Sequence, residues 1–394
     1  MRILVAGKFY YDRGGAEIVA RRCVEAYRAA GHEVGVLAMS YPQNRDLPEV
    51  AYLAREVGLG NPLAMALRTV GFDSVRHTVK KALDEFRPHA VHLHNVHSYL
   101  SPLIGKKAKE RGIPVVWTLH DYKLLCGAYT LPRGANCNKC SRNPSGLLRY
   151  RCLHDSMAMS AMGVVEAMVW NRKRILEFTD IFVAPSHYMA EMMIKGGFPE
   201  SRIRIVGNCV GPEFLESEPT STCGDYFLYV GRLAPEKGIS NLLRAAKASG
   251  VKLKIAGGGD ALADLKLKCS LLHNIEFTGP LEASEISGLM RGAKAVVVPS
   301  EWPENNPLVV MEALCSGSPV VGSRVGGIPE LLTHDCGVMF EPGNVGELTD
   351  ILSYADFKRF NREQIRDIAR EQFSPERFSR NMLGIIEEAT ECGG

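Results

Sequence analysis

The sequence lacks any uncharged apolar run of about 18 residues, the length that a membrane-spanning helix needs. The nearest candidate, residues 156–170 (SMAMSAMGVVEAMVW), is too short and carries Glu166. The start, MRILVAGKF, enters a strand at once and lacks the basic and then apolar pattern of a signal peptide. Short-period repeats and low-complexity segments are absent too. We therefore expect a cytoplasmic globular protein.

A disulfide framework is also absent, because the 11 cysteines are odd in number and scattered along a large chain. Such usage is typical of a reducing compartment. The apolar content of 46% and charged content of 23% are those of a soluble protein. With 394 residues the chain is too long for one ordinary core, which predicts two domains.

The small net charge of +3 hides an asymmetry. Residues 1–210 hold 29 Lys+Arg against 18 Asp+Glu, whereas residues 211–394 hold 18 against 26. A basic half suggests an anionic partner, such as a phosphorylated lipid, a membrane surface or nucleic acid. A solvated surface without special meaning is the alternative.

Strand-like apolar runs alternate with segments of helical period, such as GAEIVARRCVEAYRAAG. Continuous Val/Ile runs followed by helices indicate parallel sheets covered on both faces. The series restarts near residue 225, after a stretch rich in Pro, Gly, Ser and Thr. The runs in chain order are RILVAG, EVGVLAM, AVHLHN, PVVWTLH and DIFVAPS, then YFLYVGR, KLKIAGGG, NIEFTG, AKAVVVPS and PVVGS.

This pattern predicts an α/β protein of two doubly wound, Rossmann-like domains facing a cleft. We place the first domain at residues 1–210, including a cysteine-rich segment at 122–155, and the second at 211–374. The last helix, at residues 375–394, could belong to either domain, and we expect it to cross back to the first. Ligands of such sheets bind beyond the carboxyl ends of the strands.

Two carboxylates, Glu304 and Glu312, flank the segment that follows the buried run AKAVVVPS. Asn306-Pro307 resembles the N-cap and first residue of a helix, which would leave the backbone N–H groups of Leu308 and Val309 available to a phosphate. Carboxylates repel phosphate but accept hydrogen bonds from vicinal hydroxyls. The arrangement suits a sugar, a diphosphate and a ribose in a row. An exposed loop acid and an unrelated helix acid are the alternative.

Other motifs of the second half lie at strand exits. VGRLAPEKG places Arg232 and Lys237 where two cations would neutralise a diphosphate leaving group. Gly231 lets the backbone come close to a ligand, and so do Gly257 and Gly258 in AGGGD. GSRVGGIPE adds two further glycines.

In this order, VGRLAPEKG, GGGD, ENNPLVVMEALCSGSPVVGS and GGIPELL resemble the donor domain of the retaining glycosyltransferases of family 4, which have the GT-B fold. The chain resembles members of this family that act in exopolysaccharide, O-antigen and capsule assembly. The resemblance implies that Arg232 and Lys237 hold the donor diphosphate, Glu304 the donor sugar and Glu312 the ribose. It also implies no divalent cation in catalysis. One departure is Cys209 after Asn208, where the family usually has glycine.

The resemblance extends to the first half. Gly14 and Gly15 would open the first helix with N–H groups near the donor phosphate or the acceptor, followed by Glu17. His120 and Asp121 match the family's His-Asp pair near the reaction centre. His120 is expected to orient the donor or stabilise positive charge, and not to act as nucleophile. A tight turn and a structural histidine are the alternatives.

The run HLHNVHSYL carries His92, His94 and His97. His92 and His94 share one face of a strand, since alternate residues point the same way. We favour lining of the acceptor site by His94, Asn95 and His97. Packing at the strand end is an alternative role for these histidines. A metal-binding pair is another, although no carboxylate lies at ligand spacing.

Four cysteines occur within 27 residues and include a Cys-x2-Cys: Cys126, Cys137, Cys140 and Cys152. Their spacing suits tetrahedral zinc, and the surrounding Gly/Pro/Asn-rich stretch is a poor core former. Free thiols and a disulfide are the alternatives, and a catalytic role is not expected. The methionine-rich segment that follows is flanked by basic residues, which suggests docking to an anionic membrane. A core helix with a solvated flank is the competing interpretation.

The sequence thus predicts a retaining hexosyltransferase that moves a sugar from a UDP- or GDP-sugar to a glycan or polyprenyl-diphosphate-linked acceptor by front-face attack. Its expected partners are that donor, that acceptor and an anionic inner-membrane surface, with no nucleic acid. A nucleotide-sugar epimerase of the same architecture is the main alternative. A dehydrogenase is excluded because no G-x-G-x-x-G follows a strand. The acidic second half and the intact Glu pair count against a non-enzymatic binding module.

Overall fold

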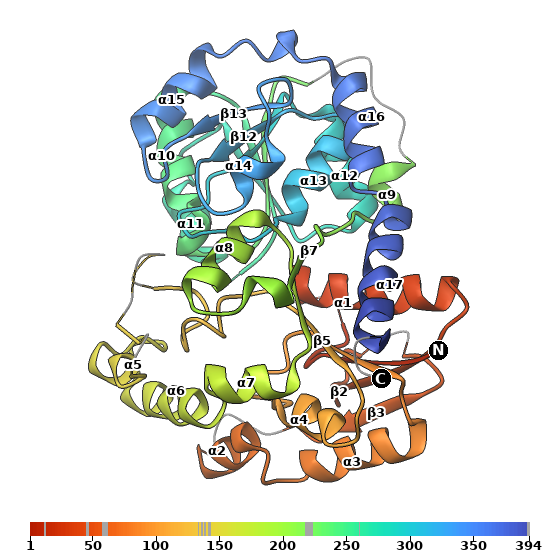
Figure 1. The fold of residues 1–394 in the computed structure, drawn as a ribbon. Coiled ribbons are helices and arrows are strands. Elements are labelled where there is room, and N and C mark those ends of the chain that lie inside the picture. Colours follow the sequence, from red (N-terminus) through yellow and green to blue (C-terminus); the bar gives the residue numbers. More distant parts are fainter. Residues whose placement is uncertain are drawn as a thin grey trace. The chain divides into compact units, whose positions relative to one another are not determined.

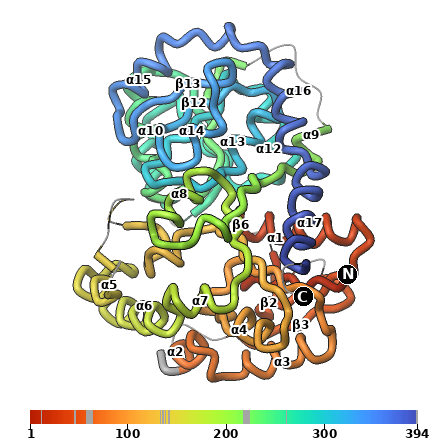
Figure 2. Tube along the Cα trace, viewed as in Figure 1, coloured from red at the N-terminus to blue at the C-terminus, as the bar shows by residue number. Residues whose placement is uncertain are grey.

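The computed structural model describes residues 1–391 apart from 12, 45–46, 57–61, 133, 135–136, 138, 141–142, 217–223 and 260. It divides into two compact units. Unit 1 comprises Met1–Gly207 and Phe378–Gly394, and unit 2 comprises Asn208–Arg377. Both described ends of the chain therefore lie in unit 1, where the last helix joins the N-terminal elements (Figure 2).

Unit 1 is built on a parallel sheet of seven strands in the order β3-β2-β1-β4-β5-β6-β7 (Figure 1). The strands are short and mostly buried, as expected where helices cover both faces of a sheet. Their bounds are β1 Arg2–Ala6, β2 Glu33–Met39, β3 Ala51–Ala54, β4 Ala90–Leu93, β5 Val115–Thr118, β6 Ile181–Ala184 and β7 Ile203–Ile205.

The helices of unit 1 fill the connections between these strands. The first of them buries one stripe of Val19, Cys23, Val24 and Tyr27, together with Glu17 in its first turn. Their bounds are α1 Gly15–Ala29, α2 Pro62–Val70, α3 Val75–Phe86, α4 Leu103–Lys109, α5 Gly146–Arg149, α6 Met157–Val169, α7 Arg172–Phe178, α8 His187–Lys195, η1 Glu200–Arg202 and α17 Pro375–Glu391.

Helix α17 returns the chain to unit 1. It buries Met382, Ile385 and Ile386 there, and its Glu388 pairs with Arg204 of β7. The helix begins in the last residues of unit 2, at Pro375.

Unit 2 repeats the architecture with a parallel sheet of six strands in the order β10-β9-β8-β11-β12-β13. Its core contains the strand side chains Leu228, Ile255, Val296 and Val321. The strand bounds are β8 Phe227–Val230, β9 Leu253–Ala256, β10 Ile275–Gly279, β11 Ala295–Val298, β12 Val320–Ser323 and β13 Gly337–Phe340. The helix bounds are α9 Pro212–Leu215, η2 Pro235–Lys237, α10 Ile239–Ser249, α11 Leu262–Lys268, α12 Ala283–Gly292, α13 Leu308–Cys315, α14 Ile328–Leu331, α15 Val345–Tyr354, η3 Phe357–Arg359 and α16 Arg362–Gln372.

The two parallel sheets confirm the doubly wound fold class. The sequence analysis found ten of these strands and missed three, β3, β7 and β13, each of which is the last strand at one edge of a sheet. Edge strands are covered less and carry a weaker apolar pattern, as the burial of β3 and β7 shows. Within the part of the chain that the structure describes, no helix is long and apolar enough to span a membrane.

Candidate functional site

The strand order of each sheet reverses direction at one point. In unit 2 this switch point lies between β8 and β11, which are hydrogen-bonded neighbours although two strands separate them in the chain. Ligands of open α/β sheets bind at such a point, beyond the carboxyl ends of the strands. The loop after β8 carries Arg232 and Lys237, and the loop after β11 carries Glu304 and Asn306. The sequence-predicted donor residues therefore come from the two loops that flank the switch point.

Lys237 and Glu304 are in direct contact across these loops. The ammonium Nζ lies 2.6 Å from Glu304 Oε1, and the Ser300 hydroxyl donates to the same oxygen at 2.6 Å. Glu304 is only 7% exposed. Its carboxylate needs these two donors, because burying a charge without partners is costly. Lys237 also lies 5.2 Å from the centre of the Trp302 ring. Ser300 and Trp302 were not singled out from the sequence.

Glycines bring the surrounding backbone together. Gly326 has a left-handed φ of 61°, and a Cβ on it would lie 2.2 Å from the backbone oxygen of Glu304. The neighbouring Gly327 N–H donates to that oxygen at 2.7 Å. These contacts fix the backbone that carries the Glu304 carboxylate.

The glycines expected to contact the donor pack against one another. Gly231 and Gly257 both have positive φ, and a Cβ on Gly257 would lie 2.0 Å from the Gly231 oxygen. Gly258 accepts a hydrogen bond from the Leu233 N–H at 2.8 Å. The loops after β8 and β9 are thus joined directly. Asp260, the last residue of the GGGD motif, lies outside the described residues.

Helix α13 begins one residue later than the sequence indicated. Pro307 occupies the N-cap position, Leu308 is the first helical residue, and no side chain caps the helix. The predicted N-cap role of Asn306 is wrong. Its side-chain oxygen instead accepts from the Asn208 backbone N–H at 2.8 Å, while Asn208 Nδ2 donates to the Asn306 backbone oxygen at 3.0 Å.

The first turn of α13 keeps the features of an anion site. The first N–H groups of any helix lack partners within it and stand at the positive end of its dipole. In α13 these belong to the half-buried Leu308 and Val309. Glu312 lies one turn further along the same helix and is half-buried.

The side chain of Arg232 is more exposed than that of Lys237. Its side chain is 63% exposed and its guanidinium pairs with Glu236, while the Tyr229 hydroxyl donates to its backbone oxygen at 2.8 Å. Burial, and then the negative charge of Glu304, raise the pKa of Tyr229. The Tyr229 phenol therefore stays neutral and keeps a hydrogen bond on the loop that carries both cations.

The switch point of unit 1 lies between β1 and β4. His94 follows β4, and His120 follows the neighbouring β5. His94 Nδ1 lies 2.8 Å from His120 Nε2, and the two rings stack at 5.1 Å between centres. His94 is only 1% exposed, so the structure connects it to any ligand through the half-buried His120.

A buried hydrogen-bond chain continues below these rings. His92 Nε2 lies 2.7 Å from the Thr118 hydroxyl, and His92 Nδ1 lies 3.0 Å from the Tyr27 hydroxyl. The rings of His92 and His94 lie 4.2 Å apart, so the prediction that they share one face is confirmed. His94 Nε2 is buried and has no hydrogen-bond partner among the described residues.

Burial sets the charge state of this histidine group. It lowers the pKa of His120 to about 4, against the opposing effect of Asp121. It also lowers the pKa of His92 to about 3 and that of His97 to about 4. All three rings are therefore neutral near pH 7. His97 stacks on Trp117 at 5.1 Å.

The loop after β1 adds a cation that the sequence analysis missed. Burial lowers the pKa of Lys8, and the carboxylates of Asp121 and Glu17 oppose that effect. Burial raises the pKa of Glu17, which Lys8 opposes in turn. Lys8, Glu17 and Asp121 therefore influence one another across the switch point. Gly14 is the N-cap of α1 and Gly15 its first residue, so Glu17 belongs to the first turn of that helix.

Four aromatic rings gather beside Lys8. Phe9 lies 5.5 Å from Tyr11, 5.2 Å from Tyr41 and 6.0 Å from Tyr99, measured between ring centres. Lys8 Nζ lies 5.3 Å from the Phe9 ring and 5.5 Å from the Tyr99 ring. We call Phe9, Tyr11, Tyr41 and Tyr99 the aromatic cluster. Its members come from three separate loops, and nothing in the sequence links them.

Asn95 contributes its backbone to this region, since its carbonyl accepts from the Lys8 N–H at 3.1 Å.

One group of described residues could hold a metal ion. The ligand atoms of Cys23, His92 and His94 lie within 4.8 Å of one another. This group includes the two histidines for which a metal pair was an open alternative. The four cysteines of the 122–155 segment are all thiols and do not form such a group.

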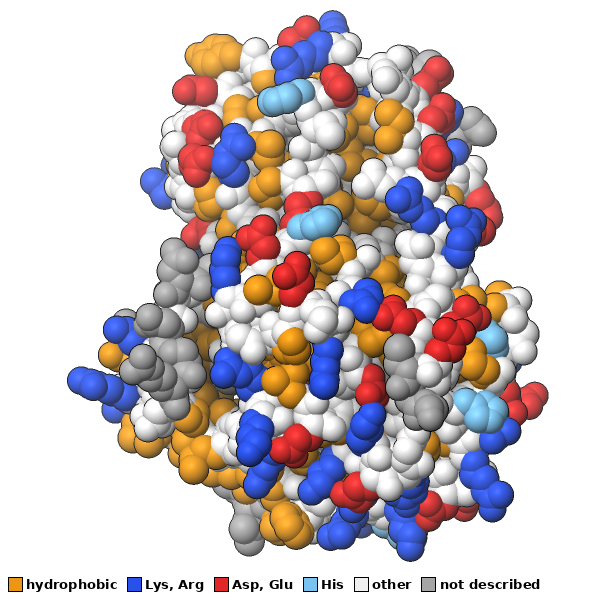
Figure 3. All heavy atoms as spheres, in the orientation of Figure 1, with side chains coloured by type: hydrophobic (Ala, Val, Ile, Leu, Met, Phe, Trp, Pro, Cys, Tyr) orange, Lys and Arg blue, Asp and Glu red, His pale blue; other side chains and the backbone are white. Residues whose placement is uncertain are grey.

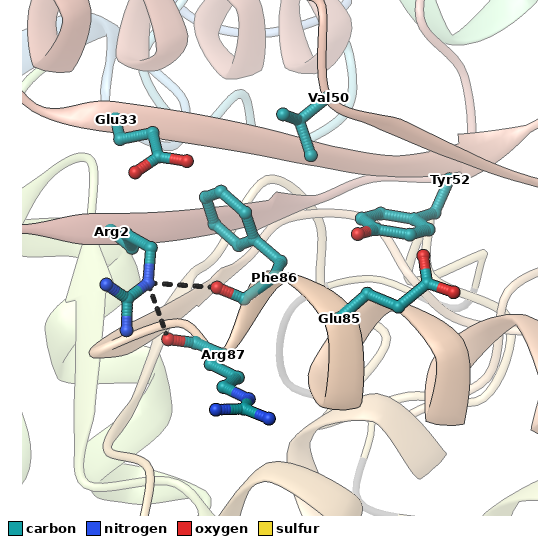
Figure 4. Close-up of a pocket in the computed structure, with 7 residues that line it drawn as sticks. All are labelled: Arg2, Glu33, Val50, Tyr52, Glu85, Phe86 and Arg87. Carbon is teal, nitrogen blue, oxygen red and sulfur yellow. Dashed lines mark hydrogen bonds between the residues drawn. The ribbon is translucent and has the colours of Figure 1, made fainter.

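An open hollow of about 460 Å³ lies at the opposite edge of the unit 1 sheet (Figure 4). Arg2 and Glu33 at the starts of β1 and β2 line it, together with Phe86 and Arg87 before β4. The Arg2 guanidinium donates to the carbonyls of Phe86 and Arg87, both at 2.9 Å. Because this is the amino edge of the strands and its cation is bound to backbone, we do not assign a substrate site to it.

The fold and the two switch-point groups define a two-domain α/β enzyme with a candidate anion site in its second half. Residues 13–214 match the family model for glycosyltransferase family 4, and residues 213–372 match the model for glycosyl transferases group 1. Together these models cover almost the entire chain.

Individual proteins agree with this match. An uncharacterized glycosyltransferase of Methanocaldococcus jannaschii, MJ1607, is 24% identical over 415 residues, which cover 97% of this chain and 96% of that protein. An uncharacterized 42.6 kDa protein in the cps region of Klebsiella pneumoniae is 27% identical over 352 residues, covering 84% and 87%. The structure of Anabaena Alr3699/HepE in complex with UDP-glucose has a TM-score of 0.70 at 18% identity, covering 98% of this chain and 100% of that one.

The chain belongs to glycosyltransferase family 4 and has the GT-B fold. It is therefore a glycosyltransferase. The alternative of a nucleotide-sugar epimerase has no support, since both family models are those of transferases.

Proposed function

We propose that the protein is a retaining hexosyltransferase of cell-surface polysaccharide synthesis. It moves a hexose from a UDP- or GDP-sugar to a hydroxyl of a glycan or a polyprenyl-diphosphate-linked acceptor. The contact of Lys237 with Glu304 at the switch point, next to the uncapped start of α13, is the observation that carries this proposal. The cps-region relative and the neighbour crystallised with UDP-glucose favour the same substrate classes.

Unit 2 takes the donor in this scheme. The diphosphate lies against the Leu308 and Val309 N–H groups and the Lys237 ammonium, with Arg232 released from Glu236 to join them. Glu304 accepts from hydroxyls of the sugar and Glu312 from those of the ribose. Gly231, Gly257 and Gly258 let the backbone come close to the nucleotide. The cations and amides stabilise the charge that develops as the diphosphate leaves, so catalysis requires no metal ion.

The transfer proceeds by front-face attack. The acceptor hydroxyl approaches from the side on which the diphosphate departs, so the C–O bond to the diphosphate breaks as the new C–O bond forms on the same face. An oxygen of the departing diphosphate takes the acceptor proton, and no protein nucleophile is needed. His120, held by His94 and neutral at pH 7, orients the donor sugar.

Unit 1 takes the acceptor. The aromatic cluster offers ring faces on which sugar rings can pack, with Tyr hydroxyls at their edges. Lys8 supplies a cation suited to a diphosphate-linked acceptor, and Gly14, Glu17, Asn95, His97 and Asp121 complete the acceptor side. His94 acts indirectly, by holding the ring of His120.

We further propose that unit 1 docks on the anionic cytoplasmic face of the inner membrane. Helix α6 turns its polar residues Ser160 and Glu166 inward, while Met168 is 61% exposed. Glu166 is held inside by Lys123 at 2.8 Å and by the Ser98 N–H at 2.7 Å. This is the reverse of the usual amphipathic pattern of a surface helix.

More apolar side chains continue this exposed face onto the neighbouring helix α2. Leu67 is exposed there, and Phe72 just beyond α2 is 70% exposed. Arg149, Arg151, Arg172 and Arg174 are exposed around it. In Figure 3, hydrophobic side chains and Lys or Arg side chains gather at the lower left, where Figure 1 places α5 and α6. Apolar and basic groups side by side suit an anionic bilayer.

A two-stage experiment tests the transferase assignment. A panel of nucleotide sugars is first ranked by thermal shift, in which the true donor raises the unfolding temperature most. The ranked donor is then incubated with membrane lipid extract as the source of acceptor, and the anomeric configuration of the product is determined by NMR. We expect the product to keep the configuration of the donor. An inverted product would contradict the mechanism, and stabilisation by no UDP- or GDP-sugar would contradict the donor class.

A further inference from the structure

The segment that follows His120 and Asp121 is held by very little apolar packing. Its own cluster of buried residues consists of Ala128, Leu147 and Leu153. Helix α5, of four residues, is its single helix before α6, among the residues described. A core this small stabilises a chain only weakly, and small folds of this kind usually rely on disulfides or metal ions.

The backbone of the same segment is strained. Among the described residues, eight other than glycine have a positive φ, and five of them lie here: Tyr129, Leu131, Arg151, His154 and Asp155. Each left-handed residue costs about 1–2 kcal/mol. Such conformations persist only where the surroundings over-determine them. Three buried apolar residues do not supply that constraint.

Three of the four cysteines of the segment lie around its small apolar cluster. Cys126, Cys140 and Cys152 all pack on the cluster of Ala128, Leu147 and Leu153. The sulfur of Cys140 also lies against the start of α5, since a Cβ on Gly146 would meet it at 3.0 Å. These cysteines therefore share one small region of the segment.

The spacing of the cysteines matches that of zinc sites. A cysteine binds a metal ion as the thiolate. Cys137 and Cys140 have the Cys-x2-Cys spacing of zinc-binding turns.

We propose that Cys126, Cys137, Cys140 and Cys152 bind one structural zinc ion as a tetrathiolate. Zinc–sulfur bonds of about 2.3 Å require the four sulfurs to draw closer together than they stand here, with release of the thiol protons. The nearby Lys123, whose ammonium lies 2.7 Å from the Gly127 carbonyl, compensates part of the resulting negative charge. The metal ion takes no chemical part in the transfer, so its failure would leave the donor assignment untouched.

The zinc ion would also hold the loop that carries His120. Lys123, three residues after His120, donates to the Gly127 carbonyl at 2.7 Å, next to Cys126. Lys123 also pairs with Glu166 of α6 at 2.8 Å. The Tyr122 N–H bonds the Tyr129 carbonyl at 3.2 Å. A fixed Cys126 therefore fixes the chain between β5 and α6, and a zinc-free protein should lose order there first.

The test measures metal in the full-length protein, purified under reducing conditions and reconstituted with zinc sulfate. Elemental analysis should find about one zinc per chain in the wild type and none in the double variant Cys137→Ser/Cys140→Ser. Cys336→Ser, which removes a half-buried thiol of unit 2, is the matched control and should keep the metal. Cys23→Ser should also keep it. Absence of zinc from the wild type, or retention of zinc by the double variant, would overturn the proposal.

X-ray absorption on the wild type makes the test independent of whether the variant folds. Four sulfur neighbours at about 2.3 Å are expected. Nitrogen neighbours at about 2.0–2.1 Å, together with loss of zinc in Cys23→Ser, would instead assign the ion to Cys23, His92 and His94 and overturn the tetrathiolate. A chelator should lower the unfolding temperature of the wild type and leave that of the double variant unchanged.

Discussion

Lys237 Nζ lies 2.6 Å from Glu304 Oε1, so a cation assigned to a diphosphate and a carboxylate assigned to a sugar neutralise each other in this structure. The Ser300 hydroxyl holds the same oxygen at 2.6 Å. Under the proposed function, Lys237 has to serve both Glu304 and the phosphate when a nucleotide sugar binds. The pair would then connect sugar recognition to leaving-group stabilisation.

Glu304→Gln should separate these two roles. Removing the negative charge leaves Lys237 a stronger partner for phosphate, so the affinity for UDP or GDP should stay unchanged or rise. Turnover of the sugar donor should fall by about 10–100-fold, because a hydrogen bond to a charged group is lost. Calorimetry and initial rates measure the two effects. Glu341→Gln, on an exposed pair with Arg324, is the control and should change neither. A large loss of nucleotide affinity in Glu304→Gln would contradict the role given to the pair.

The close approach of Gly326 to Glu304 gives a second prediction. In Gly326→Ala the new Cβ meets backbone atoms of Glu304 at 2.2 and 2.5 Å, so the carboxylate must shift. Gly343→Ala is a matched control, since Gly343 also has a positive φ but a Cβ there meets no atom within 4 Å. We expect Gly343→Ala to cost about 1–2 kcal/mol in the free energy of unfolding. Gly326→Ala should cost about 1–3 kcal/mol more, and weaken donor binding as well. Chemical denaturation and donor titration check both values, and equal effects of the two variants would rule out the contact.

The sequence predicted the architecture, and the strand exits at which the proposed donor residues lie, because these are local signals. Val/Ile runs at regular spacing indicate buried parallel strands, and the loops after β8 and β11 carry their polar residues directly at the strand exits. Edge strands such as β3 and β7 were not predicted, because half-exposed strands carry a weaker apolar pattern. Asparagine is a residue type expected at an N-cap. The Asn306 side chain instead accepts a hydrogen bond from Asn208, which is 98 residues away in the sequence.

The proposed acceptor side was harder to predict. Phe9, Tyr41 and Tyr99 stand far apart in the sequence, and only the order of β1, β2 and β4 brings their loops to one edge of the sheet. Lys8 next to a strand resembles any surface lysine until Glu17 and Asp121 are placed near it. The burial of His94 could not be predicted from the sequence either, because histidine is intermediate between the buried and the exposed residue types.

The buried histidines predict acid sensitivity. The pKa of His92 is lowered to about 3 by burial, whereas an unfolded histidine titrates near 6.5. Below about pH 6.5 the unfolded chain therefore binds a proton that the native His92 does not, so stability falls as pH falls toward 3. The slope is up to about 1.4 kcal/mol per pH unit for each such group.

The test compares free energies of unfolding between about pH 7 and pH 5. His92→Gln should have a shallower slope than the wild type, whatever its absolute stability. The exposed His334→Gln should keep the wild-type slope. An unchanged slope in His92→Gln would mean that His92 titrates alike in both states.

The exposed face of α6 predicts binding to anionic vesicles. Met168→Ser should weaken sedimentation with phosphatidylglycerol-containing vesicles, because it removes exposed apolar surface from the proposed contact. Leu271→Ser is the control, since Leu271 is 86% exposed but belongs to unit 2. Removing Arg149, Arg151, Arg172 and Arg174 should weaken binding further and reduce its salt dependence. If neither variant differed from the control, the membrane proposal would fail.

The most direct test of the account is the affinity of Lys237→Ala for UDP and GDP, measured by calorimetry beside the wild type and Lys252→Ala. Lys252 belongs to an exposed pair with Asp225 and serves as a control for loss of a charge. We predict that Lys237→Ala raises the Kd of the preferred nucleotide at least about tenfold, since it loses a charged contact to the diphosphate. Lys252→Ala should bind like the wild type. An unchanged Kd in Lys237→Ala would contradict the assignment of the diphosphate to the switch point of unit 2.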